Sequence, residues 1–216
     1  MIEKVKQIRR KLLRKLKLRP IDGVFRKLRK KGLKNFETGL EVFGYNGEYH
    51  TMNYMKDVKQ LHVWEWAADC EKPLKKNLPN AIIKITDSYK EIKETLVKFD
   101  LVVIDNHQGI FGNNYCEHFE MLPEVFRVLK NEAVIIFNII PEMNTLEKIN
   151  RGDSTSHRRR RNEWYQSVNT DKLNERFMKN FYCKLSHKQG FNTQFSFFEK
   201  RNEAISYLVI GLKKAN

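Results

Sequence analysis

The sequence predicts a doubly wound α/β domain built on a mostly parallel sheet. Apolar, β-rich runs alternate with more polar, helix-compatible stretches at a spacing of roughly 20 to 30 residues, which is the spacing of βαβ units. The runs are apolar along their whole length, as in parallel strands whose two faces are both covered by helices. Near the C-terminal end, two strand-like runs lie too close together for a crossover helix, so we expect them to pair antiparallel.

Residues 1–35 predict a basic helical arm ahead of the domain at 36–216. The arm holds 15 Lys and Arg against two acids, a net charge of +13, whereas the other 181 residues carry a net charge of only +2. Apolar residues recur at helical spacing from Ile2 to Leu16, and Pro20 separates this helix from a second one that begins at Ile21. Such an arm suits an anionic membrane surface, an acidic partner or a phosphate backbone, unless its apolar stripe packs on the domain.

The strands follow the arm in a simple order. Each is an apolar run bounded by polar or turn residues, and the last two are joined by the turn-like Arg201-Asn202-Glu203. Strands are expected at 39–43, 60–64, 81–85, 100–104, 133–140, 191–199 and 204–212, with a helix at 171–189 before the last two.

Composition excludes several classes of protein. Three widely spaced cysteines without a CxxC pair suggest neither a disulfide framework nor a structural zinc site. No apolar run reaches the roughly 18 residues of a membrane span, and the N-terminus has no apolar signal-peptide core. We therefore expect a cytoplasmic protein with one domain.

Polar residues follow the predicted strands, and in such a sheet ligands bind beyond the carboxyl ends of the strands. After the first strand, Gly44 and Gly47 flank Tyr45 and Asn46, and glycine lets the backbone turn sharply and approach a ligand closely. After the second strand, Glu65 can accept both hydroxyls of a ribose while the neighbouring Trp66 stacks on a base. The third and fourth strands are followed by Asp87, Ser88, Asp105, Asn106, His107 and Gln108.

These strand ends resemble the class I S-adenosylmethionine-dependent methyltransferases over about residues 36 to 216. The resemblance implies a seven-stranded sheet and S-adenosylmethionine bound over the glycine loop, with Glu65 on its ribose and Asp87 with Ser88 at its adenine. The usual loop of this family has three glycines, whereas Tyr45 and Asn46 here stand between two. The expected cofactor-binding residues are Glu41, Gly44, Tyr45, Asn46, Gly47, Glu65, Trp66, Asp87, Ser88, Asp105 and Asn106.

Methyl transfer is a direct displacement, so the protein mainly positions the nucleophile and, for a hydroxyl, removes its proton. His107 is the expected base, since an unperturbed pKa near 6.5 leaves it largely neutral at pH 7, although it could instead cap the next helix. Asp105 is the other candidate base, or it orients the amino group of the donor. No metal is expected, because the acids between Tyr115 and Glu120 are better explained as the start of a helix.

The acceptor is expected to contact the tract at 150–168, after the fifth strand. Arg158 and Arg159 suit an anionic or sugar-bearing acceptor, on which Trp164 and Tyr165 could stack beside His107. The alternative is a solvated loop that leads into a helix. Together with the arm, the tract favours a small-molecule or saccharide acceptor, linked to a membrane or a nucleotide. An RNA methyltransferase and a non-catalytic binding protein remain alternatives, and an aminopropyltransferase is a weaker one.

Overall fold

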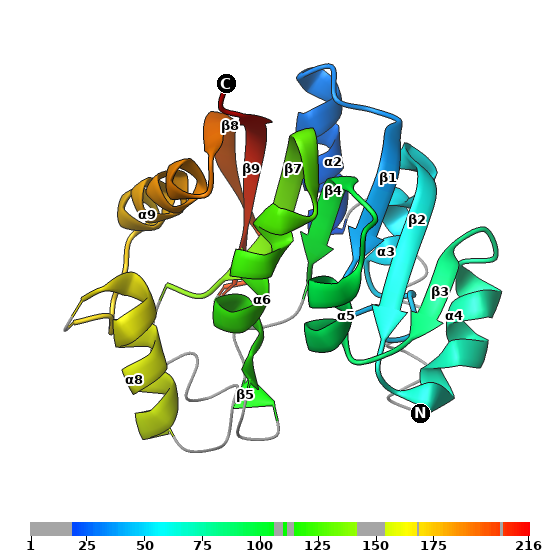
Figure 1. Cartoon of the computed structure of the whole chain (residues 1–216), viewed down its shortest axis with the longest axis horizontal. Coiled ribbons are helices and arrows are strands. Elements are labelled where there is room, and N and C mark those ends of the chain that lie inside the picture. Colours follow the sequence, from blue (N-terminus) through cyan, green and yellow to red (C-terminus); the bar gives the residue numbers. More distant parts are fainter. Residues whose placement is uncertain (1–18, 106–109, 112–114, 142–153, 168, 204) are drawn as a thin grey trace.

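The computed structural model describes residues 19–105, 110–111, 115–141, 154–167, 169–203 and 205–216 (Figure 1). Within them, seven strands form one sheet in the order β3-β2-β1-β4-β7-β9-β8, and a short hairpin forms a second sheet. The main strands are β1 (Phe36–Glu41), β2 (Val58–Glu65), β3 (Ile82–Ile85), β4 (Phe99–Ile104), β7 (Leu129–Ile139), β8 (Phe191–Lys200) and β9 (Ser206–Lys214); the hairpin is β5 (Ile110–Phe111) and β6 (Tyr115–Cys116).

The strand directions confirm the predicted fold class. β1 pairs parallel with β2 and β4, β3 pairs parallel with β2, and β7 pairs parallel with β4. β9 inserts antiparallel between β7 and β8, as the short connection between the last two runs requires. The chain order therefore reverses between β1 and β4, which is where ligands bind in open α/β sheets.

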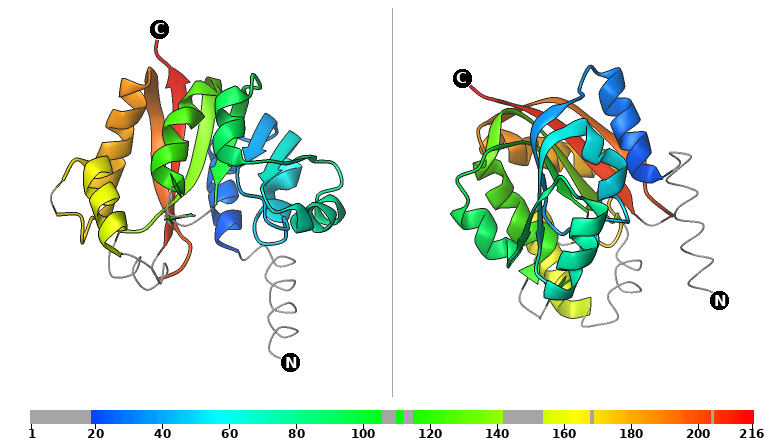
Figure 2. Two further views of the ribbon diagram at one scale, coloured as in Figure 1. Left: turned by 60° about the horizontal axis from the view of Figure 1, so that its bottom comes forward. Right: turned by 90° about the vertical axis from the view of Figure 1, so that its right-hand side faces the viewer.

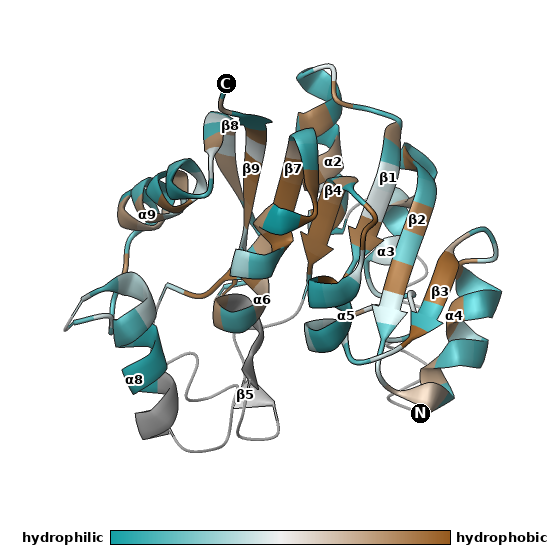
Figure 3. Cartoon of the chain, viewed as in Figure 1, coloured by the Kyte–Doolittle hydropathy of each residue, from teal (hydrophilic) through white to brown (hydrophobic). Residues whose placement is uncertain are grey.

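Helices cover both faces of this sheet (Figure 2). β4, β7 and β9 are mostly apolar, β1 and β2 carry polar stretches as well, and the helices are polar on their outer sides (Figure 3). α5 (Ser88–Glu94), α6 (Glu117–Arg127) and α9 (Glu175–Lys188) pack on one face; α2 (Pro20–Lys30), α3 (Thr51–Tyr54) and α4 (Glu71–Asn77) pack on the other; α8 (Ser154–Tyr165) and the short 3-10 helices η1 (Met55–Asp57) and η2 (Ala68–Cys70) complete the described elements.

α2 is the second helix of the predicted arm, and it is part of the packed body. Proline occupies its first turn, where the missing N–H costs nothing, and Asp22 accepts a hydrogen bond from the Arg19 N–H. The apolar stripe is fully used, because Phe25 stacks on Tyr54 at 4.8 Å between ring centroids and Leu28 is completely buried. The first predicted helix, at residues 1–18, lies outside the described residues. No helix in the described part of the chain is long and apolar enough to cross a membrane.

Candidate functional site

The loop after β1 needs both of its glycines. The Gly44 N–H donates to the Trp64 carbonyl on β2 at 2.9 Å, and a Cβ on Gly44 would stand 2.2 Å from a Val63 methyl group. Gly47 has a φ of +71°, and its Cβ would stand 2.7 Å from Leu78. A side chain at either position would collide with β2 or with the end of α4, so the loop lies tightly against both.

Tyr45 takes the conformation that a glycine would favour. Its φ is +45°, in the left-handed region, and its side chain is 65% exposed. A bulky residue in this region is strained, and such strain concentrates at ligand-binding turns. Tyr45 thus adopts a backbone conformation that glycine would take without steric cost, and it keeps this shape of the loop at a cost.

Glu65 ties this loop to the end of β2. Its carboxylate accepts hydrogen bonds from the backbone N–H groups of Tyr45 at 2.6 Å and of Trp66 and Ala67 at 3.0 Å each. A carboxylate has about four acceptor sites, so about one remains free. Glu65 is where the sequence places it, but it can accept one ribose hydroxyl more readily than two. Trp66 beside it is 77% exposed, with its ring available for stacking.

The other predicted donor residues are largely engaged with the protein. Ser88 is buried and donates to the Val42 carbonyl at 2.8 Å, which ties α5 to the end of β1. Asp87 caps α5 by accepting from the Tyr89 N–H at 2.9 Å. Asn46 accepts from the Glu48 N–H at 3.0 Å. These side chains lie at the carboxyl edge as predicted, and their observed contacts shape that edge.

Glu41, at the end of β1, is completely enclosed. Its carboxylate accepts from the Tyr54 hydroxyl and, at 3.3 Å, from the Thr51 hydroxyl. Burial raises the pKa of Glu41 to about 8, although both hydrogen bonds act in the opposite direction. The group is therefore mostly neutral at pH 7 in the described structure.

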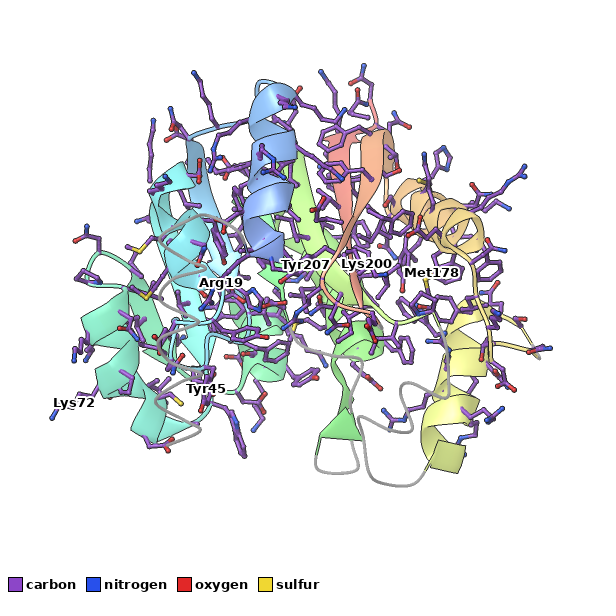
Figure 4. All side chains as sticks on the ribbon, turned by 180° about the vertical axis from the view of Figure 1, so that it is seen from behind. Arg19, Tyr45, Lys72, Met178, Lys200 and Tyr207 are labelled. Atoms are coloured by element: carbon purple, nitrogen blue, oxygen red, sulfur yellow. The ribbon has the colours of Figure 1, made fainter. Side chains whose placement is uncertain are left out.

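Asp105, predicted as a base or as a ligand of the donor, lies in a buried ionic network. Tyr207, which Figure 4 labels, belongs to the same network. Asp105 Oδ1 lies 2.8 Å from Arg201 Nη1 and accepts from Asn138 Nδ2 at 2.9 Å. Asp105 Oδ2 contacts His50 Nε2. Three elements thus converge on one carboxylate, which argues against Asp105 as a free base.

Tyr207 on β9 extends the network through the histidine ring. Burial raises the pKa of Tyr207, so its hydroxyl stays protonated, and it lies 3.0 Å from His50 Nδ1. The other ring nitrogen, His50 Nε2, contacts Asp105 and lies 3.0 Å from Arg201 Nη2, so the ring touches both members of the ion pair. The arrangement links the C-terminal hairpin, the loop after β1 and the end of β4.

The sequence analysis missed His50, Asn138, Arg201 and Tyr207. Asn138 did leave a signal, because it is the one polar residue of an otherwise apolar run at 133–140. Arg201 and His50 left none, since only the hairpin and the loop bring them to the end of β4. Among the described residues, no three His, Cys, Asp or Glu side chains gather as a metal site. Asn106 and His107 lie outside the described residues.

The predicted acceptor tract is not a solvated loop in its described part, because α8 spans Ser154–Tyr165. Tyr165 is buried, and its hydroxyl lies 2.9 Å from that of Tyr182. Its ring therefore fills the core and does not stack on an acceptor, which corrects the expectation from the sequence. Trp164 stacks on Phe119 at 5.2 Å between ring centroids. Arg158 pairs with Asp171, and the exposed Arg159 lies 3.9 Å from Glu163.

No protein-family model matches the sequence, and no curated protein matches it either. Solved structures do match the fold. A Pyrococcus horikoshii protein proposed to be an RNA methyltransferase has a TM-score of 0.55 at 13% identity, covering 91% of this chain and 83% of its own. The N-methyltransferase NodS from Bradyrhizobium japonicum has a TM-score of 0.51 at 12% identity, with 90% and 99% covered. An rRNA methylase from Streptococcus thermophilus has a TM-score of 0.51 at 8% identity, with 86% and 92% covered. The chain has the class I methyltransferase fold.

Proposed function

We propose that the protein binds S-adenosylmethionine at the carboxyl edge of β1 and β2 and transfers its methyl group to an acceptor. The observation that carries the proposal is the strand order, which reverses between β1 and β4 and places the loop from Gly44 to Gly47 beside that point. A sulfonium ligand carries no pyrophosphate, so the site needs no phosphate-binding helix N-terminus.

Several residues at this edge support a donor site. Trp66 offers an exposed ring for the adenine, and Glu65 offers its remaining acceptor site to one ribose hydroxyl. Burial raises the pKa of Glu41 to about 8, and a cationic donor nearby would lower it, because a positive charge favours the charged carboxylate. These groups position the donor, and positioning is most of what a direct methyl displacement requires.

The base and the acceptor remain predictions. His107 is the candidate base, since Asp105 is held by Arg201, Asn138 and His50. A small-molecule or saccharide acceptor at a membrane face was expected from the basic arm and the tract around Arg158. The packing of the α2 apolar stripe weakens the membrane part of that expectation, because an interfacial helix needs its apolar face free.

A non-catalytic binding protein with this fold is the second candidate. Two observations favour it: Glu65 already accepts three backbone N–H groups, and Tyr45 occupies a left-handed position with a bulky, exposed side chain. Both features hold the shape of the loop through contacts and conformations of the protein itself, as would suit a fold reused for another purpose.

Calorimetry with S-adenosylmethionine and S-adenosylhomocysteine tests the donor site directly. The wild type should bind both, and Glu65→Ala should weaken binding by about tenfold or more, because the loop after β1 loses its hydrogen bond from Tyr45, the segment after β2 loses two, and the ligand loses one. Glu94→Ala, an exposed carboxylate on α5, is the matched control and should bind as the wild type does. If neither ligand binds the wild type at high micromolar concentration, the proposal fails. Binding without methyl transfer to any cell-extract fraction would favour the second candidate.

A further inference from the structure

Four exposed cations on α2 and just beyond its C-terminal end have no acidic partner among the residues that the structure describes. Arg26, Lys30, Lys31 and Lys34 are all exposed, and we call them the α2 basic face. No acid among the described residues lies within ion-pair distance of any of these four. The remaining cations of the helix differ, since Lys27 pairs with Glu199 at 2.7 Å and Arg29 pairs with Asp57 at 2.9 Å.

The helix that carries two of these cations is packed firmly on the domain. The opposite side of α2 is packed against the sheet through completely buried residues such as Val24 and Leu28. Lys27 also lies 5.2 Å from the Phe197 ring centroid and Lys31 lies 5.0 Å from that of Phe195, so the helix is tied to β8 as well. A ligand of the basic face would therefore meet cations that are already positioned.

Helix stability alone does not account for the basic face. Cations in the last turn complement the helix dipole, which suits Lys30. Arg26, however, lies four residues before Lys30 on the same side, where like charges repel, and Lys34 lies beyond the end of the helix. An anionic partner that contacts all four positions would remove this repulsion, which would explain why the α2 basic face carries these cations.

The buried apolar stripe decides which anionic partner fits. An amphipathic helix binds a membrane by inserting its apolar side among the lipids, and α2 has none to insert because that side is packed on the sheet. Only the electrostatic contribution is left, which is the contribution that drives binding to a phosphate backbone. A nucleic-acid strand, with closely spaced charges along a line, matches a row of cations better than a lipid surface does.

We propose that the α2 basic face binds the phosphate backbone of a nucleic-acid strand. At about 1.5 Å per residue, the helix rises about 6 Å from Arg26 to Lys30, the length of about two nucleotides at 3.4 Å each, and Lys31 and Lys34 extend the face beyond the helix. The helix begins at the carboxyl edge of the sheet, where Arg19 donates to the Glu48 carbonyl at 3.0 Å in the segment after the glycine loop (Figure 4). The four cations lie in the last turns of α2 and beyond its C-terminal end, away from that edge, so they form a surface separate from the proposed donor site. Binding of a strand to this surface therefore does not rest on the proposed function.

Fluorescence anisotropy with a labelled 12-nucleotide single-stranded RNA, and with the DNA of the same sequence, tests the proposal in the absence of any methyl donor. The variant is Arg26→Glu, Lys30→Glu and Lys34→Glu in the full chain. The matched control is Lys72→Glu, Lys76→Glu and Lys93→Glu, which changes the net charge equally at exposed positions on α4 and α5, and Figure 4 places Lys72 far from α2. Circular dichroism should show both variants folded.

The wild type should bind with an affinity that falls steeply as salt increases. Each phosphate contact contributes about 0.7 to the slope of log affinity against log salt for a single strand, so losing three contacts should lower the slope by about 2. We expect affinity at low salt to fall more than tenfold in the α2 variant and less than threefold in the control. Equal losses in the two variants, or no loss in either, would overturn the proposal.

Two further measurements keep the outcome unambiguous. Sedimentation with vesicles that contain anionic phosphatidylserine should show no difference between the two variants, and a loss confined to the α2 variant, with nucleic-acid binding intact, would assign the basic face to a membrane instead. Calorimetry with S-adenosylhomocysteine should give the same affinity for wild type and α2 variant. If the protein binds RNA but not S-adenosylhomocysteine, only the proposed function is refuted. If it binds S-adenosylhomocysteine but not RNA, only the proposal for the basic face is refuted. A preference between RNA and DNA identifies the source of the strand.

Discussion

The buried ion pair of Arg201 and Asp105 allows a sharp test of the network at the end of β4. Arg201→Met removes a guanidinium whose side chain is 7% exposed and leaves a carboxylate that is 3% exposed. Breaking a buried pair by removing one partner costs about 3 to 5 kcal/mol. The low end applies here, because Nη1 and Oδ1 are 2.8 Å apart but poorly aligned for a hydrogen bond, and Asn138 still donates to Asp105. We therefore expect a loss of about 3 kcal/mol in the free energy of unfolding.

Urea denaturation of Arg201→Met, Asp105→Asn and the double variant measures this loss and its coupling. The double variant should be less destabilised than the sum of the two single variants, because no unpaired buried charge is left. Lys213→Met is the control, since Lys213 pairs with Glu132 in an exposed salt bridge, and it should leave the midpoint unchanged. A loss below about 1 kcal/mol for Arg201→Met, or additive single variants, would show that the pair is not the buried, coupled contact described.

Three further substitutions test the loop after β1 and the acid that precedes it. Because burial raises the pKa of Glu41 to about 8 from 4.5, the folded protein retains this proton between those values, so stability should fall as pH rises from about 4.5 to 8. Glu41→Gln should flatten that fall in urea midpoints at pH 5 and 8, and parallel pH profiles would contradict it. Gly47→Ala should cost more than Gly32→Ala, whose φ is also positive but whose Cβ would meet nothing within 4 Å; equal thermal shifts would remove the steric argument. Tyr45→Gly should relieve about 1 kcal/mol of left-handed strain and bind S-adenosylhomocysteine at least as well as wild type; weaker binding would assign the ring a direct contact.

The fold was predictable because the strands of a parallel sheet bury both faces. Each expected strand is a short run rich in apolar and β-branched or aromatic residues, and all seven are present in the sheet. The antiparallel hairpin followed from the short connection at Arg201-Asn202-Glu203. The sequence did not predict the burial of Arg161, because arginines usually stay in solvent. Arg161 is instead buried and donates to the carbonyls of Thr170 and Pro141, which helps α8 to pack on the domain.

The candidate site was predictable in position but not in its contacts. Spacing along the chain placed Glu65 and Asp105 at the carboxyl edge, because every parallel strand ends at that edge. It could not show that backbone N–H groups would occupy Glu65, since that depends on how the loop folds back over β2. It also could not bring Arg201 to Asp105 from 96 positions away along the chain.

The sequence by itself determined the class of fold, the polar residues at the carboxyl ends of the strands and the concentration of positive charge near the N-terminus, because periodicity, strand ends and composition are properties of the chain. Only the tertiary structure decided which of those polar groups are still available. Burial turned Glu41 into a mostly neutral acid, three side chains engaged Asp105, and packing of its apolar stripe turned α2 from a free amphipathic helix into a rigid row of cations. These outcomes depend on contacts between distant segments, which no local pattern contains.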